Sequence, residues 1–236
     1  MNRTRLLLLA LLVGVAIALV ACSGDDDSSG NANKTPAGQT AAVTAAPTNA
    51  CGEKKTVDSE VAAVKTYTAE PAMTIDTAKT YIATVKTERG DFKIKLRPDL
   101  APHHVNSFVF LAKDGYFDHV TFHRVLPGFV AQTGDPTGTG GGSPGYTIQA
   151  EFTPSLLYAR GTVGMARQAG NINSGGSQWF VSYAPSSSLD GQYTIFGEVT
   201  EGMDVVDCIT PRNPQANPNA APGDKIISIT IDESYR

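Results

Sequence analysis

Apolar and polar residues alternate in short runs over most of the chain from about residue 80 onward. The runs 80–87 and 91–97 flank Glu88-Arg89-Gly90, which predicts two antiparallel strands joined by a tight turn. Further short strands are expected at 121–126, 129–132, 162–166, 179–182, 195–199 and 226–231. Many short strands in close succession are typical of an antiparallel β architecture.

Two segments show helical rather than alternating periodicity. The first runs from Pro102, which suits the first turn of a helix, to about Gly115. The second covers 203–209 and places its apolar residues on one face. We therefore expect a mainly β fold, a closed antiparallel barrel with two α-helices, rather than repeated β–α–β units. The pattern alone also allows a β-sandwich.

The N-terminal segment has the features of an export signal. Arg3 and Arg5 precede an uncharged apolar stretch, residues 6–20, which is shorter than the roughly 20 residues of a membrane span. The stretch ends in Leu19-Val20-Ala21-Cys22, which resembles a bacterial lipobox with a lipidated cysteine. We predict a signal peptide over 1–21 and an exported lipoprotein that faces outside the cytoplasm. Acyl chains on Cys22, palmitate among them, would anchor this lipoprotein to the membrane. The alternative is an ordinary cleaved signal with an incidental cysteine.

Residues 22–70 are rich in Ala, Thr, Gly, Asn, Ser and Pro and contain almost no large apolar residue. Such a composition buries too little apolar surface to offset the entropy of ordering, so it predicts a flexible linker. The folded domain is expected over 71–236. Disulfides persist in exported proteins, but the sequence leaves open whether Cys51 and Cys208 pair or remain free thiols.

Composition and charge narrow the classes of function. A chain of 236 residues with 41% hydrophobic and 18% charged residues can form one domain with a real core, plus appendages. Its net charge of −4 and the lack of a basic run beyond the N-terminus argue against a nucleic-acid partner. The histidines form an adjacent pair, His103 and His104, and a pair four apart, His119 and His123. The second pair falls in a strand-like run, so we expect no metal site.

The segment 122–135, Phe-His-Arg-Val-Leu-Pro-Gly-Phe-Val-Ala-Gln-Thr-Gly-Asp, carries the most chemical information. It combines a cation at Arg124, an aromatic ring at Phe129 and an amide at Gln132 in an apolar strand context. This combination suits the binding of a neutral polar backbone against an apolar wall. It does not suit hydrolysis, which needs a nucleophile and a base.

Two more motifs follow this segment in order. Gly161–Arg167 leads through a loop into Ser177–Val181, and Leu189–Gly197 comes soon after. Together the three motifs resemble the cyclophilin family of peptidyl-prolyl cis-trans isomerases, over about Tyr81 to Ile231. The resemblance implies a closed eight-stranded barrel that two helices cap.

The resemblance also implies roles for individual residues. Arg124 matches the catalytic arginine, and Gln132 matches the glutamine that holds the substrate carbonyl. The residues that match the substrate-binding positions are His123, Phe129, Val130, Met165, Ala166, Gln178, Phe180, Leu189 and Tyr193. Because neighbours on a strand point oppositely, His123 should lie behind the site if Arg124 points into it. The chain departs from the family at Tyr193, where histidine is common, and at Arg167, which replaces an asparagine.

Rotation about an X–Pro bond faces a barrier of about 20 kcal/mol, because the nitrogen lone pair is delocalised into the carbonyl. A donor aimed at the prolyl nitrogen weakens that delocalisation in the twisted state, so no nucleophile, metal or cofactor is required. We expect a monomeric enzyme that acts on Pro-containing exported polypeptides and assists their folding. The alternatives are a non-catalytic module or chaperone that binds Pro-containing segments at the cell envelope, and a structural envelope protein. Arg124 favours the enzyme, since binding alone needs no such donor.

Overall fold

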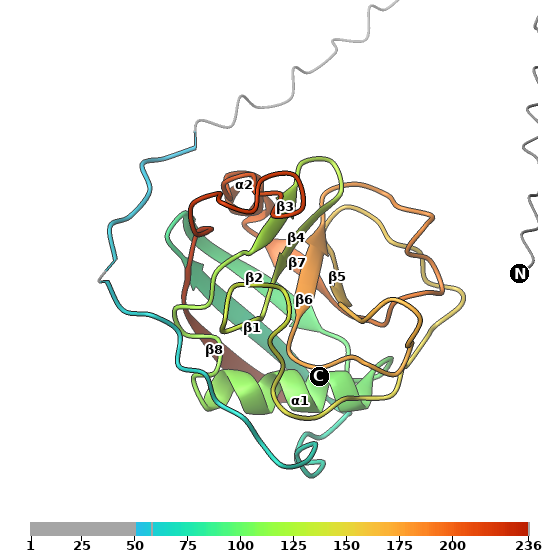
Figure 1. The fold of residues 1–236 in the computed structure, drawn as a ribbon. Coiled ribbons are helices and arrows are strands. Elements are labelled where there is room, and N and C mark those ends of the chain that lie inside the picture. Colours follow the sequence, from blue (N-terminus) through green and yellow to red (C-terminus); the bar gives the residue numbers. More distant parts are fainter. Residues whose placement is uncertain (1–50, 58, 236) are drawn as a thin grey trace, which may run out of the picture. The chain divides into compact units, whose positions relative to one another are not determined.

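Eight antiparallel strands form one strongly curled sheet in the computed structural model, which describes residues 51–57 and 59–235 (Figure 1). The strands are β1 (Lys79–Thr87), β2 (Gly90–Leu96), β3 (Arg124–Leu126), β4 (Val130–Thr133), β5 (Thr162–Met165), β6 (Trp179–Ser182), β7 (Ile195–Glu201) and β8 (Ile226–Tyr235). Their order in the sheet is β3-β4-β6-β5-β7-β2-β1-β8. The helices α1 (Pro102–Lys113) and α2 (Met203–Asp207) lie at opposite ends of the sheet (Figure 1). The predicted mainly β fold with two helices is confirmed.

The sheet is an open half-barrel, so the prediction of a closed barrel is wrong. The edge strands β3 and β8 share no ladder. The segment that precedes β3 lies between them, where the His119 amide donates to the Ile226 carbonyl and the Phe122 amide donates to the Asp224 carbonyl. A single isolated bridge joins Thr121 to Lys225. Because β3 is only three residues long, this loop takes the position that a longer strand would need to close the barrel.

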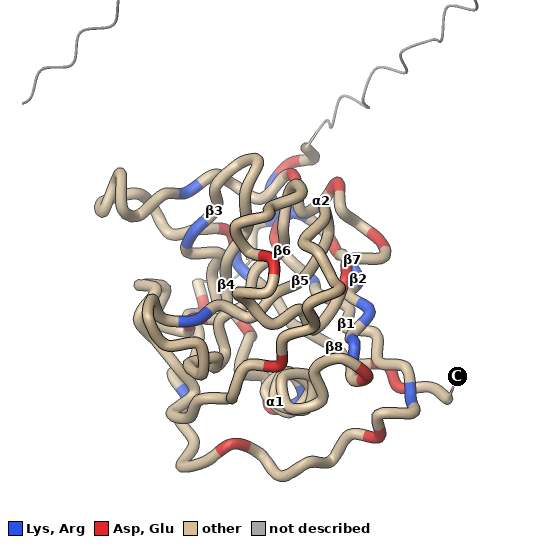
Figure 2. Tube along the Cα trace, turned by 90° about the vertical axis from the view of Figure 1, so that its right-hand side faces the viewer, with Lys and Arg blue, Asp and Glu red and all other residues tan. Residues whose placement is uncertain are grey.

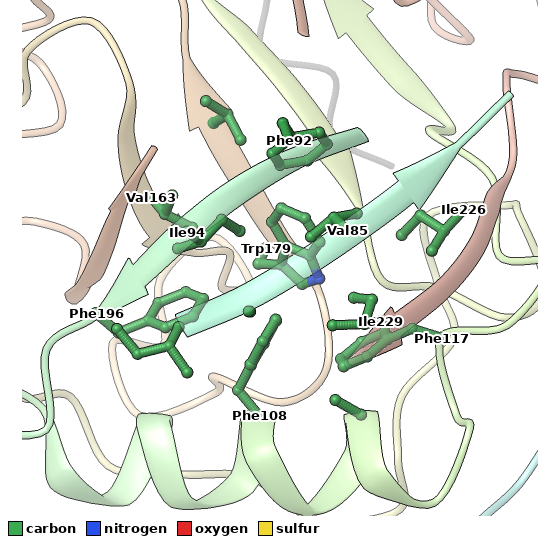
Figure 3. Packing of buried hydrophobic residues seen from close by; sticks show 14 of the residues in the cluster. Val85, Phe92, Ile94, Phe108, Phe117, Val163, Trp179, Phe196, Ile226 and Ile229 are labelled. Carbon is green, nitrogen blue, oxygen red and sulfur yellow. The ribbon is translucent and has the colours of Figure 1, made fainter. Parts of the chain in front are cut away.

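One aromatic-rich core fills the inside of the curled sheet. Trp179 of β6 is fully buried and lies 5.8 Å, between ring centroids, from Phe108 of α1 in an edge-on contact (Figure 3). Phe108 also lies 5.4 Å from Phe196 of β7. Val85 and Ile94, from β1 and β2, face the same core (Figure 3). Inside this core, aromatic rings therefore make the contacts that pack the helix against the sheet.

A remote carboxylate satisfies the start of α1. Pro102 opens the helix, and no N-cap side chain accepts a bond from its first amides. Glu151 instead accepts from the backbone amides of His103 at 3.1 Å and His104 at 3.0 Å. The His104 ring, buried beside it, contacts the same carboxylate through Nδ1 at 2.6 Å. Burial alone would raise the pKa of Glu151, but these hydrogen bonds together lower it.

Residues 51–57 and 59–70, for which the composition predicts a linker, run along one side of the domain (Figure 1) and contact it at separate points. Cys51 forms a disulfide with Cys208 at the end of α2, which settles the pairing that the sequence left open. At the other end, Tyr67 packs edge-on to Phe110 of α1 with ring centroids 5.1 Å apart, and its amide donates to the Pro144 carbonyl at 2.8 Å. A few strong anchors therefore hold a segment that has little apolar surface of its own.

An ion-pair network supports the first of these anchors. Lys54 lies 2.9 Å from Glu88 and 3.0 Å from Asp224, and Arg89 donates to Asp224 at 2.8 Å. Asp224 is buried, which alone would raise the pKa of its carboxyl. Hydrogen bonds from Arg89, Thr210 and Lys54 outweigh this effect and lower the pKa. A buried carboxylate that stays charged in this way needs its partners, so the network keeps the N-terminal segment close to β8.

We expect Cys51→Ser to detach the N-terminal segment while the sheet stays folded, because mainly ion pairs would then hold its start. The Lys55 amide donates to the Glu88 carbonyl, and its hydrogen exchange should speed up roughly tenfold or more. Amides inside β1 and β2 should keep their slow exchange. Slow exchange of Lys55 in the variant would show that the ion pairs suffice without the disulfide.

Candidate functional site

One row of side chains crosses the sheet at β3, β4 and β6. The strand register pairs Arg124 with Gln132, and Gln132 with Phe180. Paired residues lie on the same face of a sheet, whereas their neighbours along each strand lie on the other face. The neighbouring row of Val125, Ala131, Val181 and Val163 belongs to the main core. The row of Arg124, Gln132 and Phe180 therefore lies on the face directed away from that core.

A chain of hydrogen bonds fixes the polar side of this row. Arg124 Nη1 donates to Gln132 Oε1 at 3.4 Å, and Gln132 Nε2 donates to Gln178 Oε1 at 3.0 Å. Gln178 Nε2 in turn donates to the carbonyls of Gly140 at 3.0 Å and Gly142 at 2.9 Å. These contacts set which way both amides point. The glycine-rich loop thus fixes the orientation of Gln132 through Gln178.

Arg124 retains most of its donor capacity. Among the residues that the structure describes, no carboxylate forms an ion pair with it, and its bond to Gln132 is long. Its guanidinium carbon lies 5.7 Å from the centre of the Phe129 ring, a cation–π arrangement. Burial lowers the pKa of Arg124, yet a guanidinium stays protonated at neutral pH. The site therefore offers a cation with free N–H groups beside an aromatic surface.

A second apolar cluster, separate from the main core, forms the wall of the site. Phe180 stacks on Tyr158 with centroids 5.7 Å apart and meets Tyr193 edge-on at 5.8 Å. The other members of the cluster are Phe129, Val130, Leu156, Ala166, Leu189 and Ile195. An apolar wall next to a free guanidinium could hold a small ring against the aromatic surface while the cation donates to a polar atom of the same group.

Gly164 of β5 makes room for this wall. It pairs with Phe180 across the sheet, so it lies on the same face. A Cβ atom at Gly164 would come within 2.2 Å of the Tyr158 hydroxyl and 2.6 Å of Phe180. Only glycine lets both rings approach the strand this closely.

The structure brings most of the predicted site residues together but places two of them elsewhere. Arg124, Phe129, Val130, Gln132, Ala166, Gln178, Phe180, Leu189 and Tyr193 line the site or its wall. Met165 points into the main core. His123 is buried, and neither of its ring nitrogens has a hydrogen-bond partner among the described residues. Burial lowers the pKa of His123 to about 4, so the ring is neutral at pH 7.

Sequence reasoning missed four contributors to the wall, namely Leu156, Tyr158, Gly164 and Ile195. Gly164 carries a signal, since a glycine inside a strand often marks the close approach of another group. Tyr158 lies in a loop without periodicity, and no local pattern identifies it. Within the described part of the chain, no cluster of three or more His, Cys, Asp or Glu side chains could hold a metal ion.

Comparison with known proteins agrees with this geometry. The family model described as cyclophilin type peptidyl-prolyl cis-trans isomerase/CLD matches residues 82–231. A probable peptidyl-prolyl cis-trans isomerase from Brucella suis is 43% identical over 161 residues, which cover 63% of this chain and 81% of the relative. A peptidyl-prolyl cis-trans isomerase from Helicobacter pylori is 42% identical over 149 residues, which cover 62% of this chain and 88% of the relative.

Solved structures agree as well. A cyclophilin type peptidyl-prolyl cis-trans isomerase from Cryptosporidium parvum superposes with a TM-score of 0.60 at 31% identity, covering 66% of this chain and 99% of that one. The structure of the same protein in the presence of the dipeptide Ala-Pro gives a TM-score of 0.58 at 32% identity, covering 65% and 99%. The chain belongs to the cyclophilin-type peptidyl-prolyl cis-trans isomerase family and is an enzyme of that class.

Gly164→Ala tests whether the wall is packed as the structure describes it. The added methyl group must displace Tyr158 or Phe180, so we expect a loss of about 1–3 kcal/mol in the free energy of unfolding. Denaturant titration followed by the fluorescence of Trp179, the single tryptophan, measures this loss. Gly52→Ala, which would meet no atom within 4 Å, is the matched control. Equal stability of both variants would contradict the described packing.

Proposed function

We propose that this enzyme accelerates rotation about X–Pro bonds of polypeptides by donating a hydrogen bond from Arg124 to the prolyl nitrogen. Phe129, Phe180 and Leu189 would hold the proline ring on the apolar wall. Gln132, already oriented by Gln178, would hold the carbonyl side of the same bond. The donor gains strength as the nitrogen lone pair becomes localised in the twisted state, so it stabilises the transition state more than either isomer.

The observation that carries this proposal is that Arg124 forms no ion pair with any residue that the structure describes. A carboxylate partner would occupy the N–H donors of the guanidinium and neutralise its charge. The groups that contact Arg124 in the structure are instead an amide and an aromatic ring. The half-buried position removes water that would otherwise compete for the same donors. A module that only binds Pro-containing segments, the alternative function, would not need a desolvated donor at this point.

Arg124→Ala should lower kcat/KM for a Pro-containing peptide by about 10²–10³, the scale of losing one preorganised donor. Arg124→Lys should recover little of this, because an ammonium group lacks the planar fork. Arg97→Ala is the control. It removes an arginine that directly follows β2 and pairs with Asp99, and it should leave activity unchanged. If Arg124→Ala isomerises the peptide at the wild-type rate, the groove serves binding alone and the mechanism is wrong.

We further propose that the enzyme acts outside the cytoplasm as a lipoprotein and assists the folding of exported proteins. The charged start, the apolar stretch and the Leu19–Cys22 motif support export and lipidation, and all of them lie outside the described residues. The Cys51–Cys208 disulfide supports an oxidising compartment independently. Within the described part of the chain, no helix is long and apolar enough to span a membrane.

Intact-mass measurement of the mature protein tests the anchor. The proposal expects a chain that begins at Cys22 and carries acyl groups, found in the membrane fraction. Cys22→Ser should abolish the acyl mass and release the protein from that fraction. Cys51→Ser, a cysteine substitution outside the motif, should keep both. An unmodified mature protein that begins at another residue would contradict the anchor.

A further inference from the structure

A cleft of about 190 Å³ opens beside Gln132 and borders the apolar wall at Ala166. Its walls come from Gly140–Ser143 of the glycine-rich loop, Ala166–Gln168 after β5, and the segment that contains Gln178. None of the residues that line it is acidic, and one, Arg167, is a cation. The cleft is therefore a small positive site in a chain whose net charge is −4. In the view of Figure 2, basic and acidic residues are otherwise interspersed over the domain.

The Arg167 side chain is fixed at the rim of this cleft. Its guanidinium carbon lies 4.7 Å over the centre of the Tyr193 ring. Its Nε donates to the Gln192 carbonyl at 2.8 Å, and its Nη1 donates to the Gln168 carbonyl at 3.2 Å. These three contacts orient the fork before any ligand arrives, which lowers the entropy cost of binding one.

The charge of Arg167 is not neutralised within the described part of the chain. Its partners there are two carbonyls and an aromatic ring, and it forms no ion pair. Asp135 lies behind the glycine-rich loop but is fully buried, and its carboxylate accepts from the amides of Thr137 and Gly140. Nη2 of Arg167 makes no hydrogen bond to the described residues. A free donor with an uncompensated charge at a cleft rim matches a carboxylate.

Tyr193 links this cation to the proposed proline wall. It stacks under Arg167 on one side and meets Phe180 edge-on at 5.8 Å on the other. Arg167 also follows directly after Ala166, a member of the apolar cluster of the wall. The fixed charge is therefore one aromatic ring away from the surface that would hold proline.

We propose that Arg167 is a specificity-determining residue, which makes this isomerase favour polypeptides that carry an Asp or Glu side chain close to the proline. The inference rests on the proposed function, since it places the proline against Phe129 and Phe180. The carboxylate would enter the cleft and accept from the guanidinium of Arg167, with which no acidic side chain of the described residues pairs. Arg124 would not serve this purpose, because the proposed mechanism directs its donors to the prolyl nitrogen.

Peptides that differ at a single position test the preference. Glu, Gln or Lys is placed in turn at each of the two positions before and the two after proline, and kcat/KM is measured with the full chain. The wild-type protein should prefer Glu over Gln by about twofold to fivefold at one position at least, the scale of a partly exposed ion pair. The preference should weaken in high salt.

Variants assign the preference to this residue. Arg167→Gln should reduce the Glu-to-Gln ratio to about one, and Arg167→Glu should favour the Lys peptide instead. Lys93→Gln, which removes the same charge from β2 outside the cleft, should keep the wild-type ratio. The absence of a Glu preference at all four positions, or its persistence in Arg167→Gln, would overturn the inference.

Calorimetric Kd values for the same peptides separate this inference from the proposed mechanism, because Arg167 would act on binding. A Glu preference in Kd that Arg167→Gln abolishes, found without any turnover, would support the role of Arg167 while contradicting that of Arg124. Equal Kd values for the Glu and Gln peptides, found with normal turnover, would contradict only the role of Arg167.

Discussion

The register of β3, β4, β6 and β5 is the constraint on which both the core and the site depend. It directs Arg124, Gln132 and Phe180 to one face and sends the residues between them into the core. A slip of one residue in β4 would place Gln132 among the core rings and remove its contact with Gln178. An unpaired amide in that core would cost about 1–3 kcal/mol, so the packing around Trp179 enforces the geometry of the site.

The glycine-rich loop joins two parts of the molecule that lie far apart in the sequence. On one side its Gly140 and Gly142 carbonyls orient Gln178, and through it Gln132. On the other side the loop ends at Pro144, whose carbonyl accepts from the Tyr67 amide in the N-terminal segment. The next residue, Gly145, has no room for a side chain, since a Cβ there would lie 2.4 Å from the Tyr67 carbonyl oxygen. The segment that precedes the domain thus supports the loop that orients the amides.

Local pattern predicted best those strands that bury one regular face, as β1 and β2 do. The same alternation predicted that Arg124 and His123 point oppositely, and the structure places them so. The prediction of a closed barrel failed because closure depends on how a loop fits between β3 and β8. No local sequence pattern encodes that fit. Composition gave no sign that residues 51–57 and 59–70 contact the domain, because it reflects apolar content, whereas a disulfide and Tyr67 hold this part of the chain. Met165 was assigned through a motif, but its place on β5 directs it inward.

The two arginines of the site illustrate how neutral surroundings can give one kind of side chain two uses. A charged donor to a weak acceptor such as an amide nitrogen must not have its charge neutralised by a counter-ion. Neutral groups therefore have to surround the donor. Gln132 and Phe129 contact Arg124, and His123 behind the strand stays neutral because burial lowers its pKa to about 4. Arg167 likewise forms no ion pair within the described part of the chain, and Tyr193 and backbone carbonyls hold it at the cleft. Because the contacts of Arg124 and Arg167 are separate, the proposed substrate carboxylate would bind at Arg167 without neutralising the proposed donor, so selection and catalysis would not compete.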